Sequence, residues 1–111
     1  MITTHVLDTA RGRPAVGVTV ILEIRHASEW SPVARCATDR DGRTPALTAD
    51  HAVTPGTYRL TFDTGTYFRD QGIAHPFFPE ATVTFQVLDT AEHFHVPLLL
   101  SPFGYMTYRG S

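Results

Sequence analysis

Hydrophobic and polar residues alternate along several short stretches of this chain. From Val16 to Ile24 every second residue is aliphatic, and the alternation returns over Tyr58–Phe62 and Ala81–Val87. Side chains of a β-strand point alternately to its two faces, so this pattern predicts strands that each bury one face. Runs rich in β-branched and aromatic residues predict further strands over residues 2–7, 33–38, 93–99 and 104–108.

Turn-forming residues separate these stretches. Residues 39–43 read Asp-Arg-Asp-Gly-Arg, which predicts a tight turn in which Gly42 adopts a positive φ. Residues 63–72 do not follow the alternation that predicts strands. There we predict a short helix that is capped by Asp63 or Thr64 and ends at Gly72.

The number and spacing of these elements favour an all-β fold. We predict about seven or eight strands and one short helix, and turn signals every ~8–12 residues are typical of a sandwich or barrel. Pro97 stands inside an otherwise good strand without an N–H to donate, which predicts an edge position or a local bulge. The chain of 111 residues shows no internal repeat, and we predict one domain over residues 1–111.

Composition narrows the classes of partner. The formal net charge of −2 argues against a nucleic-acid partner, because proteins that bind a phosphate backbone are usually basic. The longest apolar stretch, Val96–Leu100, is too short to span a bilayer, so we expect no membrane partner. Cys36 is the only cysteine, and no signal peptide is visible. We therefore expect a soluble, cytoplasmic protein.

The six histidines are the first candidates for chemistry. His93 and His95 are two residues apart, so they share one face of a strand, and His5 lies in the opening strand. An imidazole moves protons readily near neutral pH, but a His-x-His pair also fits a metal site. The sequence places no third ligand, and it contains neither a Gly-x-Ser-x-Gly nor a His-Glu-x-x-His motif. The residues alone leave both interpretations open.

The end of the chain has an unusual composition. Tyr105, Tyr108 and Arg109 lie within the last seven residues, where a chain is poorly ordered unless something holds it. Composition alone leaves open whether this segment is a simple edge strand with a basic tip or part of a site.

Four stretches of the chain resemble the transthyretin-related 5-hydroxyisourate hydrolases, and together they cover nearly all of it. They are His5–Thr9 with Gly12–Ala15, Thr38–Arg43, Pro55–Pro79, and His93–Tyr105 closed by Tyr108–Ser111. The final Tyr-Arg-Gly-Ser is the most specific of these, because it separates the hydrolases from the carriers of thyroid hormone in the same family. Phe94, Phe103 and Met106 stand where the family often has Tyr, Tyr and Ser.

The resemblance implies a transthyretin-like two-sheet antiparallel sandwich that hydrolyses the cyclic amide 5-hydroxyisourate in urate degradation. The catalytic set of the family falls on His5, Arg43 and His95, with no metal and no other cofactor. The substrate-binding residues implied are Tyr108, Arg109, Gly110 and Ser111. The resemblance also implies a homotetramer, a dimer of dimers, with the site in the groove where two dimers meet.

Two alternatives remain beside the hydrolase. A transthyretin-like carrier of a small ligand would use the same groove, although a carrier of an apolar aromatic ligand would favour a more apolar lining. A metal-binding sandwich would be built on His93 and His95.

Overall fold

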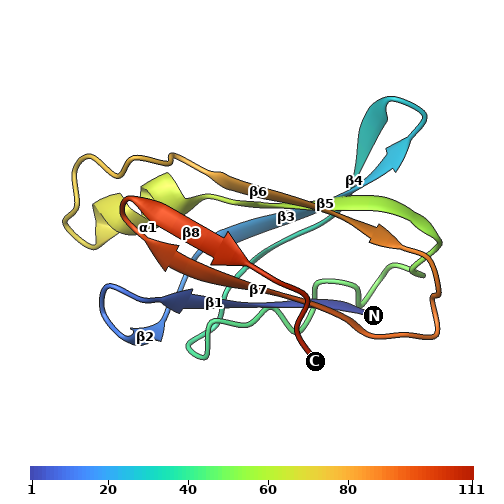
Figure 1. Ribbon diagram of the computed structural model, residues 1–111, viewed down its shortest axis with the longest axis horizontal. Coiled ribbons are helices and arrows are strands. Elements are labelled where there is room, and N and C mark those ends of the chain that lie inside the picture. Colours follow the sequence, from blue (N-terminus) through green and yellow to red (C-terminus); the bar gives the residue numbers. More distant parts are fainter.

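Two four-stranded sheets packed face to face make up the protein, as the computed structural model of residues 1–111 shows (Figure 1). The elements in chain order are β1 (Ile2–Asp8), β2 (Arg13–Pro14), β3 (Thr19–His26), β4 (Glu29–Ala37), β5 (Gly56–Phe62), α1 (Thr64–Asp70), β6 (Ala81–Val87), β7 (Phe94–Ser101) and β8 (Gly104–Thr107). One sheet has the order β2-β1-β7-β8 and the other β4-β3-β5-β6. The all-β sandwich with one short helix is confirmed.

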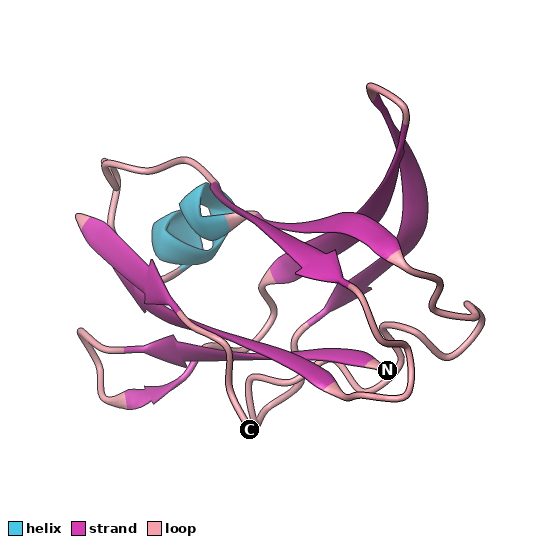
Figure 2. Ribbon diagram, turned by 45° about the vertical axis from the view of Figure 1, so that its right-hand side comes forward, coloured by secondary structure: helices cyan, strands magenta, loops and turns pink.

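One pair of strands departs from the antiparallel arrangement. The central pair of the first sheet, β1 and β7, runs parallel, with Thr3 opposite His95 and His5 opposite Pro97. Every other pair in the two sheets is antiparallel. Because β1 and β7 are parallel, both begin at the same end of the sandwich, and α1 lies at the other end (Figures 1 and 2).

The core lies between the two sheets, as the alternation predicts. Val18, Val20 and Leu22 are fully buried, and Ile24 is nearly so. These residues form the face that the alternation predicts to be apolar. In β1 the burial alternates residue by residue, so Thr3 and His5 lie on the outer face of the first sheet, away from the core. The helix begins after Asp63, whose carboxylate accepts a hydrogen bond from the N–H of Thr66, and Gly72 follows its end with φ of 86°. No helix has the length and apolar character that crossing a membrane requires.

Several boundaries differ from the prediction. β4 begins at Glu29 rather than at residue 33, because residues 26–29 close a two-residue hairpin with β3. Pro32 hid this extension, but β4 is an edge strand, where a missing N–H is tolerated. β3 begins at Thr19 rather than at residue 16, because Gly17 has a φ of 79°. The short strand Arg13–Pro14 lies in a segment for which the sequence pattern predicts no strand.

The expectation for Pro97 was wrong on both counts. β7 is an inner strand, and its register with the C-terminal segment is unbroken from the Leu98–Thr107 pair to the His95–Gly110 bridge. The backbone of Pro97 faces that segment, and its carbonyl accepts a hydrogen bond from the Thr107 hydroxyl at 2.7 Å. The missing N–H is therefore accommodated just beyond the end of β8, where it interrupts the hydrogen bonds between β7 and the C-terminal segment until the His95–Gly110 bridge.

A buried carboxylate fastens β1 to the helix. Asp8, only 1% exposed, accepts a hydrogen bond of 2.7 Å from the Tyr67 hydroxyl, and its other oxygen accepts from the N–H groups of Ala10 and Arg11. Burial and the neighbouring Asp8 carboxylate raise the pKa of Tyr67 to about 12, so the phenol keeps its proton and remains a donor.

We predict that Tyr67→Phe lowers the free energy of unfolding by about 1.5–3 kcal/mol, because a buried carboxylate loses a donor. Denaturant titration at a fixed protein concentration measures this change. The control is Tyr105→Phe, which removes a more exposed hydroxyl and is expected to change stability by less than about 0.5 kcal/mol. Equal effects of the two substitutions would show that Asp8 does not depend on Tyr67.

Candidate functional site

The outer face of the β1–β7 pair gathers the histidines that the sequence singled out. Thr3 and His5 of β1 project from this face, and His95 of β7 lies directly opposite Thr3. His93 precedes β7 by one residue and lies on the same side as His95, as their spacing predicts, with ring centroids 6.1 Å apart. The parallel register thus brings both ends of the chain into one site.

Thr3 contacts both imidazoles. Its hydroxyl oxygen lies 2.7 Å from Nε2 of His93 and 2.8 Å from Nδ1 of His95. His93 is exposed and His95 is half-buried. The orientation of both rings is therefore set by one hydroxyl on the neighbouring strand.

A tight turn places Arg43 on the other side of β1. Its N–H donates to Asp39 Oδ1 at 3.0 Å, and its carbonyl accepts from the N–H of Asp39 at 2.8 Å. The hydrogen bond from Arg43 is the main cause that lowers the pKa of the Asp39 carboxyl. Gly42 has a φ of 77°, as predicted, and its carbonyl accepts a hydrogen bond from the N–H of Val6. The turn is thereby fixed to β1, with Arg43 bridged to His5.

The C-terminal segment crosses over His95. The N–H of Gly110 donates to the carbonyl of His95 at 2.8 Å. A Cβ atom at position 110 would lie 2.6 Å from Cδ2 of His95 and 3.0 Å from Cγ of Pro97, closer than side chains pack. Only glycine lets the backbone approach the imidazole this closely.

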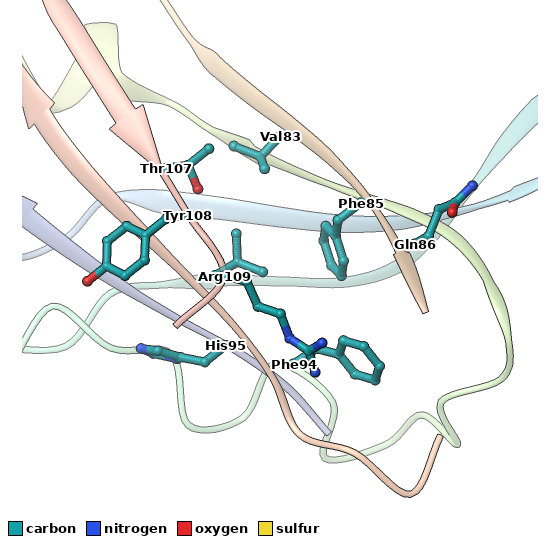
Figure 3. A pocket seen from close by; sticks show the side chains of 9 residues that line it. Val83, Phe85, Gln86, Phe94, His95, Thr107, Tyr108 and Arg109 are labelled. Carbon is teal, nitrogen blue, oxygen red and sulfur yellow. The ribbon is translucent and has the colours of Figure 1, made fainter. Parts of the chain in front are cut away.

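The two residues before Gly110 point in opposite directions. In Figure 3 the ring of Tyr108 lies to the same side as His95, while Arg109 turns the other way, towards Phe94. The guanidinium of Arg109 lies 4.9 Å from the centroid of the Phe94 ring and 3.7 Å from a carboxylate oxygen of Glu92. These contacts of Arg109 hold the end of the chain in place. Arg109 also lines an apolar pocket of about 250 Å³ between β6 and the end of the chain.

A second, polar pocket of about 410 Å³ opens on the outer face of the first sheet. It is lined by Met1, Thr3, Thr4, Arg43, Thr44, Pro45, His93, His95 and Ser111. Its volume falls within the range of small-molecule sites, and its donors include a guanidinium, imidazoles and hydroxyls. Thr44 lines this pocket, but its hydroxyl oxygen is buried and has no hydrogen-bond partner within the protein.

The surroundings of His95 favour its neutral form. Burial is the largest cause that lowers the pKa of His95, and the charges of Arg43, His93 and His5 lower it further. A neutral imidazole at neutral pH can accept a proton. The site thus combines a base with a permanent cation in one cavity.

The structure brings together most of the residues that the sequence predicted. Arg43, His95 and Ser111 line the polar pocket, and Gly110 packs on His95. His5 does not line this pocket but is bridged to Arg43, which does. Tyr108 and Arg109 line the apolar pocket instead. Sequence reasoning missed Thr3 and Thr44; the two-residue spacing of Thr3 and His5 on one strand was the available signal for Thr3.

The metal hypothesis receives no support from the arrangement of donors. It needs a third ligand, and no group of three His, Cys, Asp or Glu side chains is positioned to hold a metal ion. His93 and His95 instead direct ring nitrogens at the Thr3 hydroxyl.

The topology, with histidines and an arginine on the outer face of one sheet, defines a transthyretin-like sandwich with a polar pocket. A model described as "HIUase/Transthyretin family" matches residues 2–110. The chain belongs to this family, and the resemblance found in the sequence is confirmed.

Both 5-hydroxyisourate hydrolases and transthyretins are similar to the chain. A 5-hydroxyisourate hydrolase of Salmonella dublin is 47% identical over 111 residues, which is 100% of this chain and 81% of that protein. The structure of Klebsiella pneumoniae 5-hydroxyisourate hydrolase has a TM-score of 0.86 and 35% identity over 99% of this chain and 98% of that one. The structure of sea bream transthyretin in complex with thyroxine has a TM-score of 0.92 and 32% identity, and the match covers 98% of this chain and 93% of that one. Shape alone therefore does not separate the enzyme from the carrier.

We predict that His95 titrates below the ordinary histidine value of 6.5, and NMR of the ring signals against pH measures this. Because the folded chain binds this proton less readily than the unfolded chain, its stability falls as pH drops below 6.5. Arg43→Gln removes a nearby charge and should raise the pKa of His95. Arg40→Gln, on the same turn, should leave it unchanged; an equal shift in both variants would mean that Arg43 acts only as part of the general charge.

Proposed function

We propose that this chain hydrolyses 5-hydroxyisourate to 2-oxo-4-hydroxy-4-carboxy-5-ureidoimidazoline in urate degradation. The observation that carries the proposal is the polar pocket, in which Arg43, His95 and Ser111 line one cavity of a size suited to a small heterocycle. Two proteins named 5-hydroxyisourate hydrolase support it, with 47% and 35% identity over 100% and 99% of this chain. Residues 1–111 act as one domain in this proposal.

The reaction requires a base, a cation and a proton donor. Water adds to the carbonyl carbon of the cyclic amide, negative charge develops on the carbonyl oxygen, and the carbon–nitrogen bond then breaks. His95 accepts the proton of the attacking water, a role that suits an imidazole whose pKa is lowered. His5, beside Arg43 on the same face, enters the step with a proton on both ring nitrogens and gives one to the leaving nitrogen. His95 gains one proton and His5 loses one, so the two histidines together carry the same number of protons before and after the bond breaks.

Arg43 supplies the charge. Its guanidinium is exposed at the pocket and has no ion-pair partner in the structure, so it is available to the oxyanion or to an anionic ring. A planar guanidinium binds such groups through paired, charge-assisted hydrogen bonds. Tyr108, Arg109, Gly110 and Ser111 close the site, with Ser111 in the pocket and Arg109 as the anchor of the segment.

The carrier alternative is disfavoured by the lining of the pocket. The polar pocket has one hydrophobic residue among its nine, which suits a polar heterocycle better than an apolar aromatic ligand. Since the fold matches enzyme and carrier equally well, these side chains are the basis for the choice.

We also propose that the active form is a homotetramer, a dimer of dimers, with the polar pocket at the groove between dimers. Met106 and Tyr108 are 56% and 53% exposed, and contact with a second dimer would bury such residues. A cytoplasmic location is part of the same proposal, supported by the single free cysteine.

The test of the function uses substrate made in the cuvette from urate and urate oxidase. Decay of 5-hydroxyisourate is followed with and without the protein, with spontaneous decay as the baseline. The wild type should accelerate it, and His95→Ala should lower the acceleration by ~10²–10⁴-fold because the base is lost. A folded wild type that leaves the decay unchanged would favour the carrier.

We predict that Arg43→Lys lowers kcat by ~10²–10³-fold, because the charge remains but the planar fork is lost. The same decay assay measures this. Arg40→Lys, on the same turn but outside the pocket, is the matched control and should keep full activity. If Arg43→Lys were as fast as its control, Arg43 would serve only as a distant charge.

We predict that deleting residues 108–111 abolishes turnover and leaves the sandwich folded, because β8 ends at Thr107. Circular dichroism checks the fold, and the decay assay checks the activity. An active truncated chain would remove these four residues from the site.

A further inference from the structure

The hydroxyl of Thr3 is shared between two imidazoles, and neither contact has a role in the proposed hydrolysis as described so far. The oxygen lies 2.7 Å from Nε2 of His93 and 2.8 Å from Nδ1 of His95, both within hydrogen-bond range. Thr3 and His95 are half-buried, and His93 is exposed. A half-buried histidine is thus connected to an exposed one through a single hydroxyl.

A hydroxyl carries one hydrogen, so the two contacts impose a rule on the rings. If Thr3 donates to one imidazole nitrogen, it accepts from the N–H of the other. In one arrangement Nδ1–H of His95 donates to Thr3, Thr3 donates to Nε2 of His93, and Nε2 of His95 is free to accept a proton. In the other arrangement every bond is reversed, and Nε2 of His95 carries the hydrogen. The tautomers of the two histidines are therefore coupled.

We propose that Thr3 is a positioning residue that links His95 to His93 in a proton relay, an inference that rests on the proposed function. The relay begins with Nε2 of His95 free. When this nitrogen takes a proton from water, Nδ1 of His95 passes its own proton to the oxygen of Thr3. The hydroxyl proton of Thr3 moves to Nε2 of His93. His95 ends neutral with Nε2 protonated, His93 ends as the cation, and one proton has moved to the surface.

The charges around the pocket favour this direction. His95 faces Arg43 from the tight turn, His5 from β1, His93 from its own chain segment, and Met1 and Ser111 at the ends of the chain. A positive charge on His95 is opposed by burial and by Arg43, whereas the exposed His93 is solvated. Moving the proton outward through Thr3 lowers the cost of using His95 as the base.

The experiment compares Thr3→Val, Thr3→Ser and His93→Gln. Valine keeps the branched shape and removes the hydroxyl, serine keeps the hydroxyl, and glutamine can bond to Thr3 without accepting its proton. Thr61→Val is the control, since Thr61 is also half-buried on an inner strand but belongs to the other sheet. We measure kcat, KM and the pH dependence of kcat for 5-hydroxyisourate decay.

We expect Thr3→Val and His93→Gln to lower kcat by at least about tenfold with KM little changed, since general acid–base assistance is worth ~10²–10⁴-fold. The acidic limb of the kcat profile should also move in both variants. Thr3→Ser should restore the wild-type rate and profile, and Thr61→Val should match the wild type. Wild-type kcat and pH profile in Thr3→Val would overturn the relay, as would a Thr3→Ser variant as slow as Thr3→Val.

A second readout needs no turnover. Nitrogen-15 NMR reports the tautomer of each ring. In the wild type and in Thr3→Ser we expect that, of the two nitrogens facing Thr3, Nε2 of His93 and Nδ1 of His95, one carries a hydrogen and the other does not. In Thr3→Val this pairing should be lost. An unchanged tautomer pair in Thr3→Val would refute the coupling even if the chain proved inactive on 5-hydroxyisourate, whereas a pair that depends on the hydroxyl in an inactive chain would refute the proposed function alone.

Discussion

The parallel pairing of β1 with β7 is the constraint on which the site depends. It joins residues 2–8 to residues 94–100, so almost the entire chain lies between the two partners. An antiparallel pairing would align these strands in the opposite sense, so Thr3 would no longer lie opposite His95. The parallel register places a hydroxyl beside His95 from one side and leaves the other side of β7 free for β8 and the end of the chain.

Close backbone approach is the second condition. Gly42 and Gly110 each lie against an imidazole of the site: a Cβ atom at Gly42 would be 3.3 Å from Cδ2 of His5, and one at Gly110 would be 2.6 Å from Cδ2 of His95. Each of these imidazoles thus has a glycine backbone against its Cδ2 edge, which restricts the ring by packing. In His95 the Thr3 hydroxyl takes Nδ1 as well, and Nε2 remains for chemistry.

The sequence predicted the elements better than the way they pair. Alternation identified β5 and β6 within two residues of their ends, and Asp63 identified the start of the helix, because these signals are local. Pro97 misled the prediction, since the effect of a missing N–H depends on which neighbour the backbone faces. Thr3 and Thr44 were missed for the same reason: their roles arise from contacts across ~90 residues and from burial, which a linear pattern does not contain.

The attachment of the last residues has a consequence for motion. Beyond Thr107 the backbone is held to β7 by the single hydrogen bond from Gly110 to His95, because Pro97 offers no donor. The contacts of Arg109 with Phe94 and Glu92 add to it, but the side chains of Arg109 and Glu92 are 58% and 52% exposed. A net backbone hydrogen bond contributes only ~0.5–1.5 kcal/mol, so this segment has a far lower free energy of local opening than the sheets. One wall of the polar pocket can therefore detach and return while the sandwich stays folded, and the amide of Gly110 would exchange faster than those inside the sheets.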